Sequence, residues 1–129
     1  MDISLLAFGA AYHYGEPDKS EQVSEYNNFN PGLGFKLSMK VEDSYSETNI
    51  NMVCGYYRNS IDNDSFFVGP GIEFGKDYGL QISIVHISGY YNTIYDTTVL
   101  IGGFYKYENF SFHSVFVGDG IGFYVEFEL

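Results

Sequence analysis

The sequence predicts an all-β protein, an eight-stranded antiparallel up-and-down β-barrel of the outer-membrane type. Segments of about 9–11 residues alternate large apolar side chains with small or polar ones, which is the pattern of a membrane-crossing β-strand. Phe and Tyr, which favour strands, account for 12 and 13 of the 129 residues. An even number of consecutive antiparallel strands can close without an open edge, so one domain over residues 1–129 is expected.

The first four predicted strands lie on either side of polar segments. Residues 3–14 are mainly apolar and lead into a long polar loop over residues 15–30. In residues 31–41 the odd-numbered side chains are nearly all large and apolar, whereas the even-numbered ones are Gly, Lys or Ser. After a short acidic turn, residues 48–59 lead through a second polar turn into residues 65–75, which alternate in the same way.

The last four predicted strands follow the same pattern. Residues 79–89 and 97–107 alternate on either side of an aromatic, polar connection. A Glu-Asn turn leads into the Phe-rich residues 110–117, and a Gly-Asp-Gly turn leads into residues 121–129.

In every predicted strand one face is almost entirely apolar, and the other mixes Gly, Ser, Lys, Glu and His. A barrel in lipid would turn the apolar face outward, whereas a soluble barrel would turn it inward. Some large apolar residues also occupy the mixed face, where they would be poorly placed in water but could line an apolar pocket. These residues are Phe67, Val85, Ile87, Leu100, Phe104 and Val115.

Composition excludes several classes of function. The net charge of −11 argues against nucleic-acid binding and against electrostatic docking on anionic lipid heads. Cys54 is the single cysteine, no ligand spacing suggests a metal, and no motif suggests a cofactor. No apolar run is long enough for a transmembrane helix, and the first residues lack a basic signal-peptide region. We therefore expect either an outer-membrane protein whose signal peptide has been removed or a cytoplasmic protein.

Two stretches resemble the lipid A palmitoyltransferase (PagP) family. The first begins at His13, where that family has its catalytic histidine. It continues through a polar loop containing Tyr26 and Asn27 to a glycine-rich strand that ends in Gly-Phe-Lys-Leu-Ser at Ser38.

The second stretch of resemblance surrounds the turn after residues 48–59. Here Asn59 and Ser60 fall on the Asp-Ser pair of the PagP family, and Gly69 and Gly71 fall on two glycines of its next strand. Arg58, the only arginine of the chain, precedes this pair. A guanidinium group at that place could bind a phosphate or stabilise an oxyanion.

The resemblance implies an eight-stranded barrel in the outer membrane of Gram-negative bacteria. It implies transfer of an acyl chain from a phospholipid to lipid A, with the chain inside the barrel and Gly71 at the floor of its pocket. His13 and Ser60 would then be catalytic and Asn59 supporting, with Arg58, Tyr26, Asn27, Gly69 and Gly71 contacting substrate. We expect a monomer whose partner is phospholipid or lipid A.

Three departures from the family keep an alternative open. Asn59 replaces the family's aspartate and carries no charge, no segment of the sequence corresponds to the family's N-terminal amphipathic helix, and the chain has no Trp. A barrel that binds a lipid or another apolar ligand without catalysis, either in the membrane or in water like a lipocalin, fits these departures. A deacylase using His113 and Ser114 is less favoured, because adjacent strand residues face opposite sides.

Overall fold

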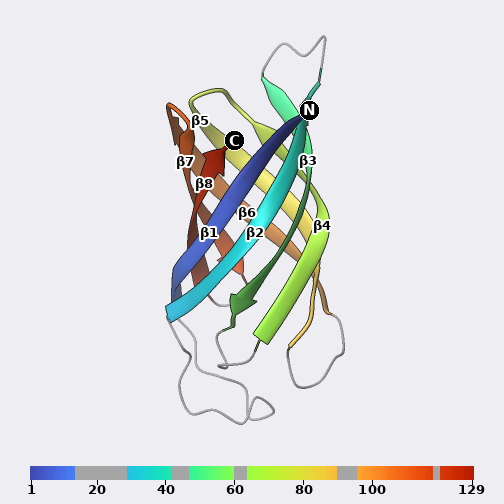
Figure 1. Cartoon of the computed structure of the whole chain (residues 1–129), viewed down its shortest axis with the longest axis vertical. Coiled ribbons are helices and arrows are strands. Elements are labelled where there is room, and N and C mark those ends of the chain that lie inside the picture. The colour runs from blue at the N-terminus through green and yellow to red at the C-terminus, as the bar shows by residue number, and fades with distance from the viewer. Residues whose placement is uncertain (14–28, 42–46, 60–63, 90–95, 118–119) are drawn as a thin grey trace.

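The computed structural model describes residues 1–13, 29–41, 47–59, 64–89, 96–117 and 120–129. In these residues eight antiparallel strands form a closed barrel, in which each strand pairs with its neighbours in the sequence and β8 pairs with β1 (Figure 1). The strands are β1 (Asp2–His13), β2 (Phe29–Lys40), β3 (Thr48–Arg58), β4 (Asp64–Phe74), β5 (Tyr78–Ile87), β6 (Asp96–Tyr107), β7 (Phe110–Val117) and β8 (Gly120–Glu128). Within the described ranges, no helix is long and apolar enough to span a bilayer.

The two ends of the barrel differ. Both chain termini lie toward the same end, which we call the terminal end (Figure 1). At this end the chain turns between β4 and β5 and between β6 and β7 within a few residues. At the other end, which we call the long-loop end, β1 is separated from β2 by residues 14–28 and β5 from β6 by residues 88–95.

The β4–β5 turn depends on Gly75. Its φ of 123° lies in a region that L side chains rarely adopt, and a Cβ there would lie 2.1 Å from the carbonyl oxygen of Tyr78. The Gly75 amide also donates a hydrogen bond to Glu47 O at 2.8 Å, which joins this turn to the start of β3. A glycine is therefore required for this tight connection.

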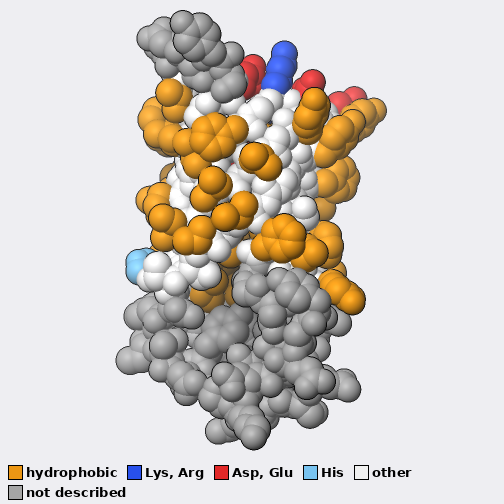
Figure 2. All heavy atoms as spheres, turned by 180° about the vertical axis from the view of Figure 1, so that it is seen from behind, with side chains coloured by type: hydrophobic (Ala, Val, Ile, Leu, Met, Phe, Trp, Pro, Cys, Tyr) orange, Lys and Arg blue, Asp and Glu red, His pale blue; other side chains and the backbone are white. Residues whose placement is uncertain are grey.

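The apolar face of each strand points outward. Most buried side chains are polar or charged, and the buried apolar ones are limited, in the described chain, to Leu6, Val85, Ile87, Phe104 and Val115. By contrast, large apolar side chains such as Phe66 (63 % exposed) and Leu80 (62 % exposed) cover the outer wall. Figure 2 shows them spread over the part of the barrel wall that is not grey, with charged side chains at the terminal end. Of the two orientations that the sequence left open, the structure has the apolar face outside and the mixed face inside.

The ladder between strands is interrupted at two places. The β1–β2 register shifts between Phe8 and Ala10, opposite a segment of β2 that contains Pro31. The β4–β5 pairing is broken over Gly69 and Pro70. Proline has no amide hydrogen to donate to a neighbouring strand, so it is tolerated where pairing lapses.

Candidate functional site

The residues expected to be catalytic belong to the long-loop end. His13 is the last residue of β1, and Asn59 directly follows the last residue of β3. Both strands pair with β2, but the β1–β2 ladder ends at Ala10 and Phe29, so His13 lies three residues beyond the last pair with β2. Ser60, Tyr26 and Asn27 lie outside the described residues, and for His13 only the place at the end of β1 is described.

The buried side-chain amide of Asn59 connects three segments of the barrel. Its side chain is fully buried, and its Nδ2 donates hydrogen bonds to Ser65 Oγ at 2.8 Å and to Gly89 O at 3.0 Å. The amide therefore joins the end of β3 to the start of β4 and to the residues that follow β5. An aspartate could not donate these bonds and would place an anion beside a carbonyl oxygen. This geometry gives a physical reason for Asn at a position where the PagP family has Asp.

Arg58 points to the outside of the barrel, away from Asn59, as the strand alternation predicts. Its guanidinium lies 3.0 Å from Asp64 Oδ1, which also accepts a hydrogen bond from the Tyr56 hydroxyl at 2.8 Å. Its backbone carbonyl accepts a hydrogen bond from Asn30 Nδ2 at 2.9 Å. The arginine thus lies on the outer wall, where the apolar surface meets the long-loop end.

The two glycines carried over from the resemblance both face the lumen. A Cβ on Gly69 would lie 1.9 Å from Ile84 O, so this glycine permits a close approach of β5. A Cβ on Gly71 would lie 2.6 Å from both Asn51 Oδ1 and Ser83 Oγ. Gly71, which we expected at the floor of an apolar pocket, therefore has polar side chains as its nearest neighbours.

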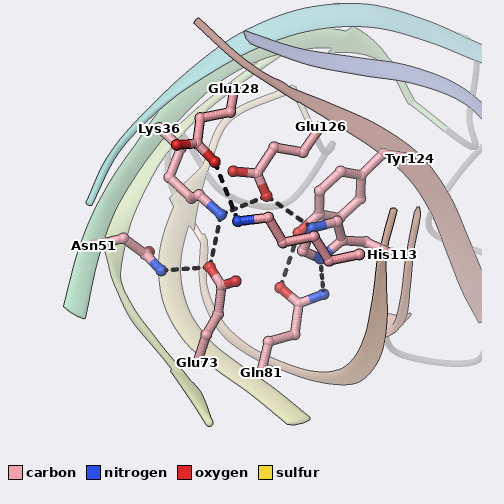
Figure 3. Close-up of polar contacts among 9 residues, drawn as sticks. Lys36, Asn51, Glu73, Gln81, His113, Tyr124, Glu126 and Glu128 are labelled. Atoms are coloured by element: carbon pink, nitrogen blue, oxygen red, sulfur yellow. Dashed lines mark hydrogen bonds and ion pairs between the residues drawn. The ribbon is translucent and has the colours of Figure 1, made fainter. Parts of the chain in front are cut away.

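A buried ionic cluster that the sequence analysis did not identify crosses the lumen (Figure 3). The Lys36 ammonium lies 2.7 Å from Glu73 Oε2 and 2.5 Å from Glu126 Oε1, and all three side chains are buried. Asn51 Nδ2 donates a further hydrogen bond to Glu73 Oε2 at 3.0 Å. The lysine of β2 therefore links carboxylates on β4 and β8.

The cluster extends through His113. Its Nε2 lies 2.9 Å from Glu126 Oε1, and its Nδ1 lies 2.8 Å from Gln81 Nε2. The Gln81 carbonyl oxygen accepts a hydrogen bond from the Tyr124 hydroxyl at 2.8 Å. In this arrangement the glutamine donates to Nδ1, so the proton of a neutral imidazole is on Nε2 and points at the glutamate. The imidazole also stacks on the Tyr124 ring, with centroids 4.5 Å apart.

The same cluster contains the donor atoms of a metal site. Ligand atoms of Glu73, His113 and Glu126 all lie within 4.8 Å of one another. Carboxylate and imidazole groups are ligands that Zn²⁺ accepts. The Lys36 ammonium, however, lies between the two carboxylates and supplies the positive charge that an ion would bring. The arrangement is therefore an ion-pair network with Lys36 as its cation.

The two halves of the lumen differ in polarity. Glu73 and Glu126 lie close to the ends of their strands at the terminal end. Toward the long-loop end the interior becomes aromatic, because the Phe8 ring packs 5.4 Å from Phe67 and 6.3 Å from Tyr57, measured between centroids. The interior thus changes from ionic near the terminal end to aromatic farther along the barrel axis, and the buried Asn59 and Ser65 make the long-loop end polar again.

No protein-family model matches this sequence, and no curated protein matches it. The functional argument therefore depends on the residues and their geometry. His113 and Ser114, the pair considered for a deacylase, face opposite sides: His113 is buried in the lumen and Ser114 lies half-buried on the outer wall, as predicted.

Proposed function

We propose that this chain is an integral outer-membrane β-barrel that acts on membrane lipid, with acyl transfer as its reaction. The observation that carries the proposal is the inverted distribution of side chains, with large apolar groups outside and ionic groups inside. Apolar surface exposed to water costs about 25 cal/mol for each Å². The apolar outer wall avoids this cost when lipid surrounds the barrel and incurs it when water does.

The dimensions and the two ends support the membrane placement. The strands have 8 to 12 residues, compared with about 9–11 in membrane-crossing strands. The longest connections, residues 14–28 and 88–95, lie at the end opposite both termini, although that end also has the short connection of residues 118–119 and the terminal end has residues 41–47. Longer loops at one end of the barrel are typical of bacterial outer-membrane proteins. Exposed aromatic side chains occur near both rims, with Tyr78 and Tyr107 at the terminal end and Tyr12 and Phe29 at the long-loop end. Tyrosine and phenylalanine there would supply the interfacial belts that tryptophan supplies in other barrels.

The proposed reaction takes place at the long-loop end. An acceptor hydroxyl attacks the ester carbonyl of a phospholipid, and His13 takes the hydroxyl proton. The acyl–oxygen bond of the phospholipid breaks, and the leaving oxygen takes that proton to give the lysophospholipid. Ser60 hydrogen-bonds the reacting oxygen. The support is the position of His13 and Asn59 at the ends of two strands that share β2 as neighbour, together with the resemblance to the PagP family.

The test has two steps. The chain is first refolded with and without detergent, and β-type circular dichroism with monodisperse elution is expected only with detergent. The lipid A of outer membranes that contain the protein is then analysed by mass spectrometry. Wild type should add one acyl chain to lipid A, and His13→Ala and Ser60→Ala should abolish this addition. Ser114→Ala, on the outer wall, should retain it.

A non-catalytic lipid-binding barrel is the second candidate, and the environment of Asn59 favours it. The side-chain amide already joins three segments through Ser65 and Gly89, which is a structural role that needs no chemistry. In that case wild-type protein would fold only in detergent and retain lipid through purification, yet leave the mass of lipid A unchanged.

A further inference from the structure

A row of three residues crosses β3, β4 and β5 on the inner face of the barrel. Asn51 pairs with Gly71, and Gly71 pairs with Ser83, so the glycine lies between an amide and a hydroxyl group. A Cβ on Gly71 would lie 2.6 Å from both Asn51 Oδ1 and Ser83 Oγ, and the carbonyl oxygen of Ile82 lies 3.3 Å from the same point. Oxygen atoms of three residues therefore converge on the point at which any other residue would begin its side chain.

The side-chain oxygen of Asn51 in this row is a buried acceptor. Within the part of the chain that the structure describes it has no hydrogen-bond partner, and Ser83 beside it is buried as well. Asn51 Oδ1 and Ser83 Oγ thus lie on either side of the space over Gly71 and do not bond to each other. Because buried polar atoms in folded proteins are nearly always satisfied, an unpaired one indicates a bound water or ion.

The adjoining ionic cluster has an excess of negative charge. Glu73 and Glu126 contribute two carboxylates, and Lys36 is the single ammonium group between them. The His113 imidazole adds no charge in the arrangement described above, in which Gln81 donates to its Nδ1. One negative charge of this buried cluster therefore has no compensating cation within the cluster. A buried charge is unfavourable unless it is paired, so a further cation nearby would be stabilising.

Asn51 connects the row of oxygens to this negative charge. Its Nδ2 donates a hydrogen bond to Glu73 Oε2 at 3.0 Å, while its Oδ1 lies over Gly71 (Figure 3). Neighbouring hydrogen bonds polarise one another in a low-dielectric interior, so the bond to the carboxylate increases the negative charge on the amide oxygen. Asn51 Oδ1 is therefore a stronger ligand for a cation than an amide oxygen without such a partner.

The donor atoms favour a monovalent metal cation. All three are oxygens of uncharged groups, and carbonyl oxygens of this kind coordinate sodium in transporters and potassium in channels. Zinc sites use imidazole and thiolate groups, and calcium and magnesium sites rely on carboxylates. A water molecule would satisfy Asn51 Oδ1 but would leave the excess charge of the cluster unbalanced. One monovalent ion matches the one negative charge that Lys36 leaves uncompensated.

We propose that Asn51, Ser83 and the backbone carbonyl of Ile82 bind a monovalent metal cation beside the ionic cluster of the lumen. Gly71 makes the site possible, because it has no Cβ between the oxygens. The ion would balance the charge of Glu73, to which the Asn51 amide is bonded. The site is separate from the catalytic residues proposed at the long-loop end, and it does not depend on acyl transfer.

Thermal unfolding of the whole chain, refolded in a non-ionic detergent, tests the proposal with sodium as the probe ion. Sodium chloride replaces choline chloride at constant ionic strength, so that general screening of charges does not change. The melting temperature of wild type should rise with the sodium concentration. At ten times the dissociation constant, the folding equilibrium should shift about elevenfold toward the folded state, because only the folded chain binds the ion.

Two variants remove the site in different ways. The methyl group of Gly71→Ala would take the place of the ion, and it meets only the ends of the Asn51 and Ser83 side chains at close range, which can move aside. Ser83→Ala removes one of the ligand oxygens. Both variants should lose the sodium response. Ser111→Ala, which removes another buried hydroxyl group of the lumen on β7, is the matched control and should keep it.

Two results would overturn the proposal. Equal melting temperatures of wild type in sodium and in choline would assign the row of oxygens to water. Equal sodium responses in wild type, Gly71→Ala and Ser83→Ala would show that the ion binds elsewhere on the chain. Both results are separable from failure of the proposed function, because a chain that leaves the mass of lipid A unchanged can still respond to sodium.

Discussion

At the scale of single residues, Asn59 is needed as a hydrogen-bond donor, and a carboxylate at this position could not replace its amide. We expect Asn59→Asp to lower the free energy of unfolding by about 1–3 kcal/mol, because a buried carboxylate would face Gly89 O without a donor. Thermal unfolding in detergent measures the effect. Asn109→Asp, at an exposed turn, is the matched control and should leave the melting temperature nearly unchanged. Equal melting temperatures for both variants would refute the structural role.

Lys36 gives a second prediction for a single residue. Lys36→Met leaves Glu73 and Glu126 without their cation, and removal of one partner from a buried ion pair costs about 3–5 kcal/mol. Lys106→Met removes a half-exposed partner of Glu128 and should cost at most about 1 kcal/mol. Urea unfolding in detergent compares the two variants. A similar loss in both would show that the lumen cluster contributes no more than a surface pair.

The ligand set around Lys36 leads to a third prediction. In Lys36→Met, Zn²⁺ should restore part of the lost stability, because the donor atoms of Glu73, His113 and Glu126 lie within 4.8 Å of one another. Wild type, whose ammonium fills the position, should not respond. Lys36→Met combined with His113→Ala should not respond either. Stabilisation of this double variant by Zn²⁺ would assign the effect to another site.

Among the elements, the β4–β5 turn is sensitive to a single methyl group. Gly75→Ala combines an unfavourable φ with a Cβ 2.1 Å from Tyr78 O, so we expect a loss of about 1–3 kcal/mol. Gly103→Ala is the control, since a Cβ there would lie no closer than 3.5 Å to its nearest neighbour. Melting temperatures in detergent should fall only for the first variant.

The same elements show which parts of the structure a sequence can predict. Every predicted strand begins and ends within two residues of the observed one, because alternation and turn residues act locally. The alternation also placed Lys36, Glu73, His113 and Glu126 on the mixed face of their strands, but it left open whether that face points inward. Their convergence did not follow from the alternation, since the tilt and register of a closed barrel decide which inward side chains meet across the lumen. The only signal was the presence of charged residues on the mixed face of different strands.

At the scale of the whole molecule, one charged residue placed on the apolar outer wall tests whether lipid or water surrounds the barrel. Ile101 lies in the middle of β6 and faces outward. Ile101→Arg should cost about 2–4 kcal/mol in a bilayer, whereas Tyr107→Arg at the rim should cost about 0–1 kcal/mol. Unfolding in lipid vesicles measures both. Equal and small effects would indicate an outer wall in contact with water.

The lumen cluster also makes the last strand decisive for assembly. Glu126 belongs to β8, the final strand of the chain, and it is a partner of both Lys36 on β2 and His113 on β7. In a nascent chain that still lacks β8, Lys36 would have only Glu73 as a carboxylate partner, and His113 would have no contact with Glu126. The ion pairs of the lumen are therefore complete only when β8 pairs with β1. Closure of the barrel and completion of its internal ion pairs are one event.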